Sequence, residues 1–345
     1  MRNSLRILSL IDIPWYSGLT EYALVQARAL REVGHNVFFA IPGENKIFNE
    51  IANDFETIKI SGREKILRIK DIISISKLIN NKKIDIINAH TGRTQTLAYL
   101  ISLINKPIKI IRTKADAKQI KKSFTYSKVL CIICGSKYIE NMYKNAGIKI
   151  KTQTVYLSYP AVKTKEIKEE KPFRITIVGR LDPVKGHINF IKAGLLILEK
   201  RKDVEFIIAG KESNIKWKDL AQIIPDKFKR YFRYYGFVED VYSLMAESHI
   251  GVISSIGSEA VSRVAIEWMN SQRAVISSNA GCLVELFEPD YIYPKESFIE
   301  LADKIEKNLN FERIKRIGMD NKKRFNEIFS FENLQNKTSE IFENL

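Results

Sequence analysis

The fold is decided by the stretch Ile175-Thr-Ile-Val-Gly-Arg-Leu-Asp-Pro-Val-Lys-Gly-His187. Its first four residues are apolar or β-branched, which predicts a buried strand ending at Val178. Gly179 permits a turn that offers backbone N–H groups, and Arg180 and Lys185 add a fork-shaped cation and a point cation. This combination suits a diphosphate. Taken alone the signal is weak, because junctions between strands and helices often carry solvated basic residues.

Strands and helices alternate on both sides of this stretch. The predicted strands are residues 5–13, 37–41, 84–88, 108–113 and 129–134 in the first half, and 175–178, 204–209, 231–235, 250–254 and 274–277 in the second. Helical patterns lie between them, and a helical tail follows Glu296. Such alternation predicts an α/β fold of two tandem Rossmann-like domains with parallel sheets. Ligands of these sheets bind at the carboxyl ends of strands, so we expect the site in a central cleft.

The chain has 345 residues, which is too long for one ordinary domain. A segment of Lys, Glu and Thr lies between Pro160 and Pro172 and predicts a linker. The expected organisation is an N-terminal domain over residues 1–162, the linker over 163–172, a second domain over 173–329, and a C-terminal helix over 330–345.

The composition is that of a globular protein, with 45% apolar and 28% charged residues. The apolar runs are too short to span a bilayer, and Asp12 interrupts the only segment that resembles a signal peptide. We therefore expect a cytoplasmic protein without a transmembrane helix. Three cysteines cannot form a disulfide framework, and Cys131 and Cys134 lie in an apolar run where buried strand residues are expected.

The positive charge is concentrated in the first half of the chain. The net charge is +16, and residues 1–165 hold 28 basic against 12 acidic residues. Residues 106–151 hold twelve basic residues against Asp116 and Glu140. This imbalance predicts an anionic partner, such as a membrane surface, an acidic glycolipid or nucleic acid. A lysine-rich solvated surface is the alternative.

One further segment, residues 63–79, predicts a basic amphipathic helix with Ile66, Ile69 and Ile73 on one face. That face could contact a membrane or pack on its own sheet, and packing is the commoner outcome. The prediction of membrane docking therefore depends on the cations of residues 106–151.

A second motif places Glu259 and Glu267, with seven residues between them, across a strand exit and the following helix. The pair can bracket a nucleotide sugar, with Glu259 facing the sugar hydroxyls and Glu267 the ribose. The helix N-terminus between them would face the phosphates. Two carboxylates at this spacing could otherwise be ordinary charges on a helix surface.

The motifs in this order and spacing resemble the retaining GT-B glycosyltransferases of family 4. The matching segments are residues 178–187, 236–240, 259–267 and 281–285 in the second half, and 16–21, 34–37 and 85–90 in the first. The resemblance covers nearly the whole chain. It implies a GT-B fold and the transfer of a sugar from a nucleotide-diphosphate sugar. It also implies that residues 1–162 bind the acceptor, that residues 173–329 bind the donor, and that the helix over 330–345 packs back on the first domain.

The resemblance also implies roles for individual residues. Arg180 and Lys185 would grip the donor diphosphate, and His90 would lie beside the reacting sugar. With Glu259, these residues form the expected catalytic set. The expected donor-binding residues are Gly18, Gly179, Arg180, Lys185, Phe237, Val238, Glu259, Ser262, Arg263 and Glu267, with the base held by main chain near Phe237 and Val238. The expected acceptor-binding residues are Arg93, Arg112 and Lys114.

Several positions depart from the family pattern. Ser262 and Arg263 replace a glycine and a neutral residue, Cys282 replaces a second glycine, and Asn88 replaces a common histidine. Arg263 adds a cation at the helix start, and either contact with the diphosphate or a salt bridge to the other domain would explain it. His35, His187 and His249 are interpreted as structural residues at the starts of strands and a helix.

These observations predict a retaining glycosyltransferase that acts on a hydroxyl of an anionic, lipid-linked or lipopolysaccharide-type acceptor. We expect it at the inner face of the cell membrane. No cofactor and no metal are expected, because cations of the chain can stabilise the leaving diphosphate and no Asp-x-Asp motif lies near a strand end.

Two alternatives remain at this stage. A GT-B epimerase would share the donor half but would not need a basic acceptor domain. A nucleic-acid-binding protein would explain the charge, yet aromatic residues are sparse among the cations of residues 106–151. We therefore expect no nucleic acid partner. An NAD-dependent enzyme is disfavoured because no Gly-x-Gly-x-x-Gly follows Ile13.

Overall fold

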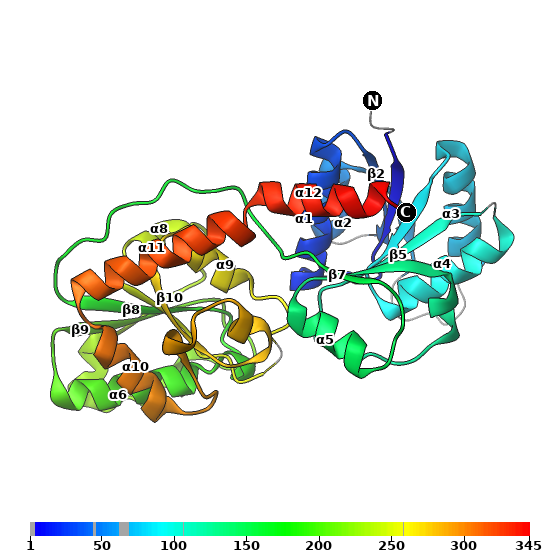
Figure 1. Ribbon diagram of the computed structural model, residues 1–345. Helices are drawn as coiled ribbons and strands as arrows, with labels where there is room; N and C mark the ends of the chain where they lie inside the picture. Colours follow the sequence, from blue (N-terminus) through cyan, green and yellow to red (C-terminus); the bar gives the residue numbers. More distant parts are fainter. Residues whose placement is uncertain (1–3, 44–45, 62–68, 106, 258) are drawn as a thin grey trace. The chain divides into compact units, whose positions relative to one another are not determined.

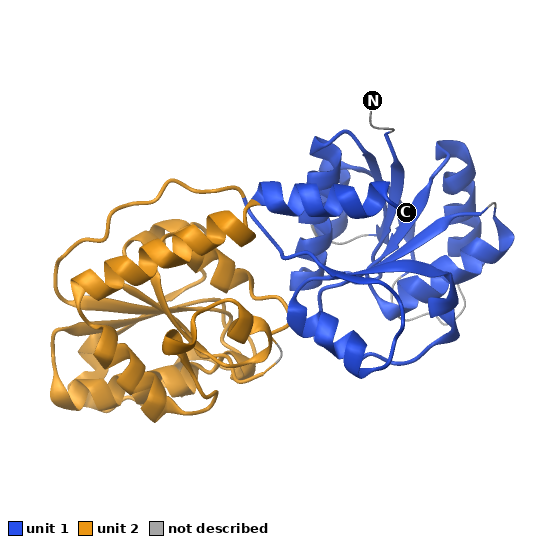
Figure 2. Cartoon of the chain, viewed as in Figure 1, with its two compact units in different colours: residues 1–159, 331–345 blue, residues 160–330 orange. Residues whose placement is uncertain are grey.

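The computed structural model describes residues 4–43, 46–61, 69–105, 107–257 and 259–345. The chain divides into two compact units (Figure 2). Unit 1 holds residues 1–159 and 331–345, and unit 2 holds residues 160–330. Each unit is a parallel sheet with helices on both faces (Figure 1). The prediction of an α/β chain with two tandem Rossmann-like domains is confirmed.

The sheet of unit 1 has seven strands in the order β3-β2-β1-β4-β5-β6-β7. The strands are β1 (Arg6–Leu10), β2 (Asn36–Pro42), β3 (Glu56–Ile60), β4 (Ile86–Ala89), β5 (Lys109–Lys114), β6 (Val129–Cys134) and β7 (Thr152–Thr154). All pairs are parallel. The strand order reverses between β1 and β4, and such a switch point is where an open α/β sheet leaves a crevice for a ligand.

Helices begin where side chains can cap them. Unit 1 contains α1 (Gly18–Glu32), α2 (Lys46–Asp54), α3 (Ile69–Lys82), α4 (Gly92–Ile104), η1 (Phe124–Lys128), α5 (Lys137–Asn145) and α12 (Phe331–Glu343). Ser17 and Thr91 accept N–H groups from the third residues of α1 and α4, which stabilises the first turns of these two helices. The predicted helix over residues 63–79 begins at Ile69 in the structure, and residues 63–68 lie outside the described part.

The helix α12 belongs to unit 1 and packs against α1 (Figure 1). Gln335 Nε2 donates to Glu32 Oε2 at 2.7 Å. The buried ring of His35 accepts from the N–H of Leu5 through Nδ1, so its proton is on Nε2, which lies 3.3 Å from Glu343 Oε1. This imidazole therefore joins the start of β1 to the end of α12.

The sheet of unit 2 has six parallel strands in the order β10-β9-β8-β11-β12-β13. The strands are β8 (Phe173–Val178), β9 (Val204–Ala209), β10 (Phe232–Gly236), β11 (Ile250–Ile253), β12 (Ala274–Ser278) and β13 (Ile292–Tyr293). The order reverses between β8 and β11, which places the stretch that ends β8 at the switch point of this sheet.

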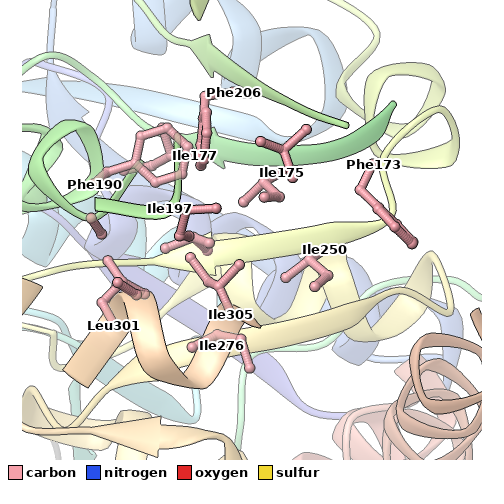
Figure 3. Packing of buried hydrophobic residues seen from close by; sticks show 14 of the residues in the cluster. Phe173, Ile175, Ile177, Phe190, Ile197, Phe206, Ile250, Ile276, Leu301 and Ile305 are labelled. Carbon is pink, nitrogen blue, oxygen red and sulfur yellow. The ribbon is translucent and has the colours of Figure 1, made fainter. Parts of the chain in front are cut away.

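The helices of unit 2 cover both faces of this sheet. They are α6 (His187–Lys200), α7 (Trp217–Ala221), α8 (Val241–Ala246), α9 (Arg263–Asn270), α10 (Phe298–Asn308) and α11 (Phe311–Ile328), with the 3-10 turns η2 (Pro183–Lys185), η3 (Asp226–Tyr231), η4 (Gly281–Glu285) and η5 (Pro289–Tyr291). Figure 3 shows the core, in which Phe190 and Ile197 of α6 and Leu301 of α10 pack on Ile175 and Ile177 of β8. Burial of these side chains holds the strand that carries the site loop.

The segment predicted as a linker, residues 163–172, is part of unit 2. Ile167 is buried in the core of this unit, and the buried guanidinium of Arg273 donates to the carbonyl of Lys165 at 2.9 Å. Nε2 of His249 lies 2.9 Å from the carbonyl of Lys168. The segment is therefore a strap fixed along unit 2 rather than a free connector. Its polar composition predicted the absence of helix or strand but not this attachment.

The three cysteines are free and buried. The prediction that Cys131 and Cys134 are buried strand residues is confirmed. No helix in the described part of the chain is long and apolar enough to cross a membrane.

Candidate active site

The loops at the carboxyl ends of the unit 2 strands approach one another very closely. Gly186 has φ +70°, and a Cβ there would lie 1.9 Å from the carbonyl oxygen of Ser254. Gly281 has φ +55°, and its Cβ would lie 2.0 Å from the carbonyl oxygen of Glu259. Only glycine fits such positions. The two glycines therefore bring the exits of β8, β11 and β12 together around one spot.

Lys185 and Glu259 meet at this spot. Lys185 Nζ lies 2.5 Å from Glu259 Oε1, and Ser255 Oγ donates to the same oxygen at 2.7 Å. The Glu259 side chain is buried, whereas that of Lys185 is partly exposed. A buried carboxylate requires such partners to offset the loss of hydration. The structure thus brings together two residues for which the sequence predicts contacts with different parts of the donor, the diphosphate for Lys185 and the sugar for Glu259.

Arg180 lies on the outer side of the same loop. Its guanidinium is exposed, with Nη2 3.6 Å from Asp182 Oδ2. Asp182 holds the loop instead, because it accepts from the N–H of Val184 and from Asn214 Nδ2 at 2.8 Å. An exposed pair at 3.6 Å contributes little to stability. The Arg180 side chain is therefore available to an anion at the end of β8.

The helix α9 begins beside the Glu259 loop. Ser262 is its N-cap residue, and the buried Ser262 Oγ finds no hydrogen-bond partner among the described residues. The first N–H groups of a helix carry a partial positive charge and suit an anion. Arg263 Nε lies 2.7 Å from Glu267 Oε1, so this pair forms within α9. Arg263 therefore has a partner within its own helix. This partner differs from the two that the sequence suggested, the diphosphate and a residue of the other domain.

The region expected to hold the base follows β10. Phe237 is 74% exposed, and Val238 packs on a small cluster of Ile207, Ala209 and Leu244. The N–H of Gly179 donates to the carbonyl of Ala209 at 2.9 Å, which completes the pairing of β8 and β9. Phe237 therefore presents an exposed aromatic ring two strands away from the Gly179 turn.

In unit 1, His90 follows β4 at the switch point of the sheet. Its Nε2 lies 2.8 Å from Ser9 Oγ of β1, and its Nδ1 has no hydrogen-bond partner among the described residues. Burial, with a smaller effect of the Arg112 charge, lowers the pKa of His90 to about 3. The ring is therefore neutral at pH 7, and it can exchange hydrogen bonds without carrying charge.

The other residues expected in unit 1 have different surroundings. Arg112 is buried in β5 and donates from Nη1 to the carbonyls of Ala89 and Thr113, both at 2.9 Å. Lys114 Nζ lies 2.8 Å from Asp116 Oδ1, and burial lowers the pKa of Lys114 below its ordinary value. Arg112 thus ties neighbouring strands together. Its assignment to the acceptor remains a prediction.

Gly18 and Arg93 occupy comparable places at the starts of α1 and α4. Both are exposed, and a Cβ at Gly18 would meet no atom within 4 Å. The position of Gly18 at the start of α1 is therefore open to solvent.

Comparisons with known proteins agree with this geometry. A family model described as "Glycosyl transferases group 1" matches residues 172–310, and one described as "Glycosyl transferase 4-like" matches residues 12–145. The chain belongs to the GT-B glycosyltransferases. Because both models describe transferases, they disfavour an epimerase.

Individual relatives of this glycosyltransferase are distant in sequence. An uncharacterized glycosyltransferase, MJ1178 of Methanocaldococcus jannaschii, is 23% identical over 356 residues, with 97% of each chain covered. The crystal structure of a glycosyltransferase from Rickettsia africae superposes with a TM-score of 0.86 at 19% identity, covering 99% of this chain and 98% of that one. Anabaena Alr3699/HepE in complex with UDP superposes with a TM-score of 0.81 at 15% identity, covering 99% and 100%.

Some residues of the glycosyltransferase site have no clear signal in the sequence. Ser255 is one, because its contact with Glu259 depends on how the loop after β11 turns. A buried polar group near His90 is another. Asn88 Nδ2 donates to Gln26 Oε1 at 2.9 Å, and Thr113 Oγ1 donates to Asn88 Oδ1 at 2.8 Å. Polar residues in otherwise apolar strands are the only sequence signal for this group.

Proposed function

We propose that this glycosyltransferase is retaining and metal-independent, and that it transfers a sugar from a nucleotide-diphosphate sugar to a hydroxyl of an anionic, lipid-linked or lipopolysaccharide-type acceptor. The observation that carries the proposal is the cluster of Lys185, Glu259 and Ser255 at the switch point of unit 2, with Arg180 on the same loop. The complex of Anabaena HepE with UDP supports a nucleotide donor for this fold.

The donor would bind by exchanging partners within this cluster. An incoming diphosphate competes with Glu259 for Lys185, because both are oxyanions within reach of one ammonium group. Once Lys185 turns to the diphosphate, the carboxylate of Glu259 is free to accept hydrogen bonds from sugar hydroxyls. Ser255 Oγ keeps the carboxylate oriented during the exchange.

The chemical step develops negative charge on the leaving diphosphate. Arg180, Lys185 and the N-terminus of α9 would stabilise that charge, which is the largest catalytic contribution that fixed cations and dipoles can make. In the front-face substitution implied by the family resemblance, the leaving phosphate itself takes the proton of the acceptor hydroxyl. No carboxylate then needs to act as base, and the anomeric configuration is retained.

The acceptor is proposed from charge. Residues 106–151 carry twelve basic against two acidic residues, and anionic saccharides or lipid headgroups would complement them. We place the enzyme at the inner face of the cell membrane for the same reason. Free nucleic acid is not proposed, because few aromatic residues accompany these cations.

The test begins with thermal-shift measurements against a panel of nucleotide sugars, because a bound donor raises the melting temperature by mass action. NMR of the product formed from the selected donor then gives the anomeric configuration. We expect the configuration of the donor, with activity unchanged in EDTA. An inverted product would overturn the retaining mechanism, and loss of activity in chelator that Mg²⁺ or Mn²⁺ restores would overturn metal independence.

A further inference from the structure

Large apolar side chains are exposed together on one flank of unit 1. They come from α3, α4 and η1, and this surface is here called the apolar ridge: Ile69, Ile73, Leu100, Leu103, Ile104 and Phe124. Ile69 and Ile104 are each 64% exposed, and Phe124 is 71% exposed. Single exposed apolar residues are normal, but a group of them on neighbouring elements marks an interaction surface.

The helices α3 and α4 are neighbours, so their parts of the ridge adjoin (Figure 1). Asn105 Nδ2, directly after α4, donates to Ser76 Oγ of α3 at 3.0 Å. Residues three and four positions apart share a helix face, and Ile69, Ile73 and Ser76 have this spacing. The isoleucines of α3 therefore lie on the side of that helix that meets the end of α4.

The turn η1 lies against the other side of α4. Gln95 Nε2 donates to Thr125 Oγ1 at 2.9 Å, and the rings of Tyr99 and Phe124 meet edge to face with centroids 5.2 Å apart. Phe124 thus rests on α4 through one edge and exposes most of its ring. The ridge runs from α3 across α4 to η1.

The core of unit 1 does not need these side chains. The inner faces of the same helices are already filled, by Ile75 and Leu78 on α3 and by Leu97 and Ile101 on α4. The ridge residues are therefore additional apolar surface that water solvates in this structure. Transfer out of water would be favourable for each of them.

The elements that carry the ridge and the segment before η1 also carry exposed lysines, here called the flanking lysines. They lie on α3 and on the segment that leads through η1: Lys70, Lys77, Lys118, Lys121, Lys122 and Lys128. The acidic residues of α3, α4 and residues 115–128 are Asp71 and Asp116. Asp71 is buried and accepts from the N–H of Ser61, and Asp116 accepts from Lys114 Nζ. The described surface of these segments thus presents no exposed carboxylate.

We infer that the apolar ridge inserts into the headgroup region of an anionic bilayer while the flanking lysines bind lipid phosphates. Apolar side chains bordered by lysines, without exposed acids, are the pattern of a surface that lies in a membrane interface. Lysines near an anionic leaflet give reversible membrane binding that salt weakens. Burial of apolar groups adds a contribution to the binding free energy that salt does not screen. The inference rests on the proposed membrane-bound acceptor and deepens it by naming the surface that docks.

The test compares vesicles of phosphatidylcholine with vesicles that also contain phosphatidylglycerol, at low and high salt. The ridge variant carries Leu103→Ser and Ile104→Ser, and the charge variant carries Lys118→Gln, Lys121→Gln and Lys122→Gln. Ile299→Ser on α10 of unit 2 is the matched control, because Ile299 is 58% exposed but lies outside the ridge. Neither seryl change adds charge, so only the apolar contribution is altered.

We expect the full-length protein to bind the anionic vesicles and to retain part of this binding at high salt. The ridge variant should bind the anionic vesicles about tenfold more weakly at both salt concentrations, since Leu103 and Ile104 no longer transfer their apolar surface out of water. The charge variant should lose mainly the salt-sensitive part, and Ile299→Ser should bind like the unaltered protein.

Equal partitioning of the ridge variant and the unaltered protein would overturn the inference, as would absence of binding to either vesicle. If light scattering shows a dimer of the unaltered protein that the ridge substitutions dissociate, the inference is overturned and the ridge is a contact with a second copy of the chain. Transfer to a detergent-dispersed acceptor is measured in parallel. If the unaltered protein transfers no sugar in this assay, the proposed function is overturned. If it transfers sugar but does not bind the vesicles, only the docking surface is overturned.

Discussion

Lys185 and Glu259 form an ion pair in which Nζ and Oε1 are 2.5 Å apart, although each is expected to contact a different part of the donor. The pair joins the loop after β8 to the loop after β11. The cation thus offsets the charge of a buried carboxylate. In the proposed function, the same contact links the two donor sites, because an ammonium group that moves to the diphosphate leaves Glu259 Oε1 to the sugar.

Removal of the loop cations should lower turnover without unfolding the protein. We expect Arg180→Ala and Lys185→Ala each to reduce kcat by about 10²-fold or more, because each removes a charge-assisted contact that strengthens as the phosphate leaves. Steady-state kinetics at saturating donor measures the effect. Lys323→Ala is the control, because the Lys323 side chain lies on the exposed face of α11. Turnover unchanged in both loop variants would refute the diphosphate assignment.

Substitution of Glu259 and substitution of Glu267 should have different effects on nucleotide binding and on turnover. Glu259→Gln is expected to lower kcat with little loss of nucleotide affinity, since Glu259 is proposed to contact the transferred sugar rather than the nucleotide. Glu267→Gln should weaken nucleotide binding and should also release Arg263 from its 2.7 Å contact. Calorimetric titration with nucleoside diphosphates checks affinity. If both variants bound poorly but turned over normally at saturation, the roles would be wrong.

The helix α12 should be essential for the stability of unit 1. Phe342 is 1% exposed, so Phe342→Ala is expected to lower the free energy of unfolding by about 3–5 kcal/mol. Deletion of residues 330–345 should destabilise this unit further. Thermal and urea unfolding measure both changes, with Lys337→Ala on the exposed face as control. Normal melting of the truncated chain would show the helix to be dispensable.

The stability of unit 1 should depend on pH through His90. Burial lowers its pKa from 6.5 to about 3, so the unfolded chain binds the proton more tightly than the folded one. The free energy of unfolding should therefore fall as pH decreases from about 6.5 towards 3. Urea unfolding across this range should show a weaker pH dependence for His90→Gln than for the unaltered protein. The same slope in both would remove His90 as the cause.

The sequence predicted those elements whose pattern is strong. The run of β6 is continuously apolar and that of β9 is apolar apart from Glu205, and the predicted bounds of both strands agree with the structure. The strands β3, β7 and β13 were not predicted. The three and two residues of β7 and β13 are too few for a periodic signal, and Glu56 and Lys59 interrupt the short apolar pattern of β3. Their pairing depends on strands that are distant in sequence, so only the folded sheet reveals them.

The sequence predicts candidate site residues but not their contacts. The motif around Arg180 and Lys185 carries a local signal, and the structure places it after the carboxyl end of β8, as expected. The pairing of Lys185 with Glu259 spans 74 positions and depends on the close approach at Gly186. The face of α3 also differs from the commoner expectation, because Ile69 and Ile73 are exposed and do not pack on the sheet.

The place of α12 has a consequence for how the protein is made. Unit 1 contains residues on both sides of unit 2 in the chain, so unit 2 is in effect an insertion into unit 1. A ribosome releases residues 331–345 only after all of unit 2 has been synthesised. Until then the surface of α1 that receives α12 and the imidazole of His35 lack their partners. The first unit to be translated is thus the last to be completed, and the nascent chain exposes part of that unit's apolar surface throughout synthesis.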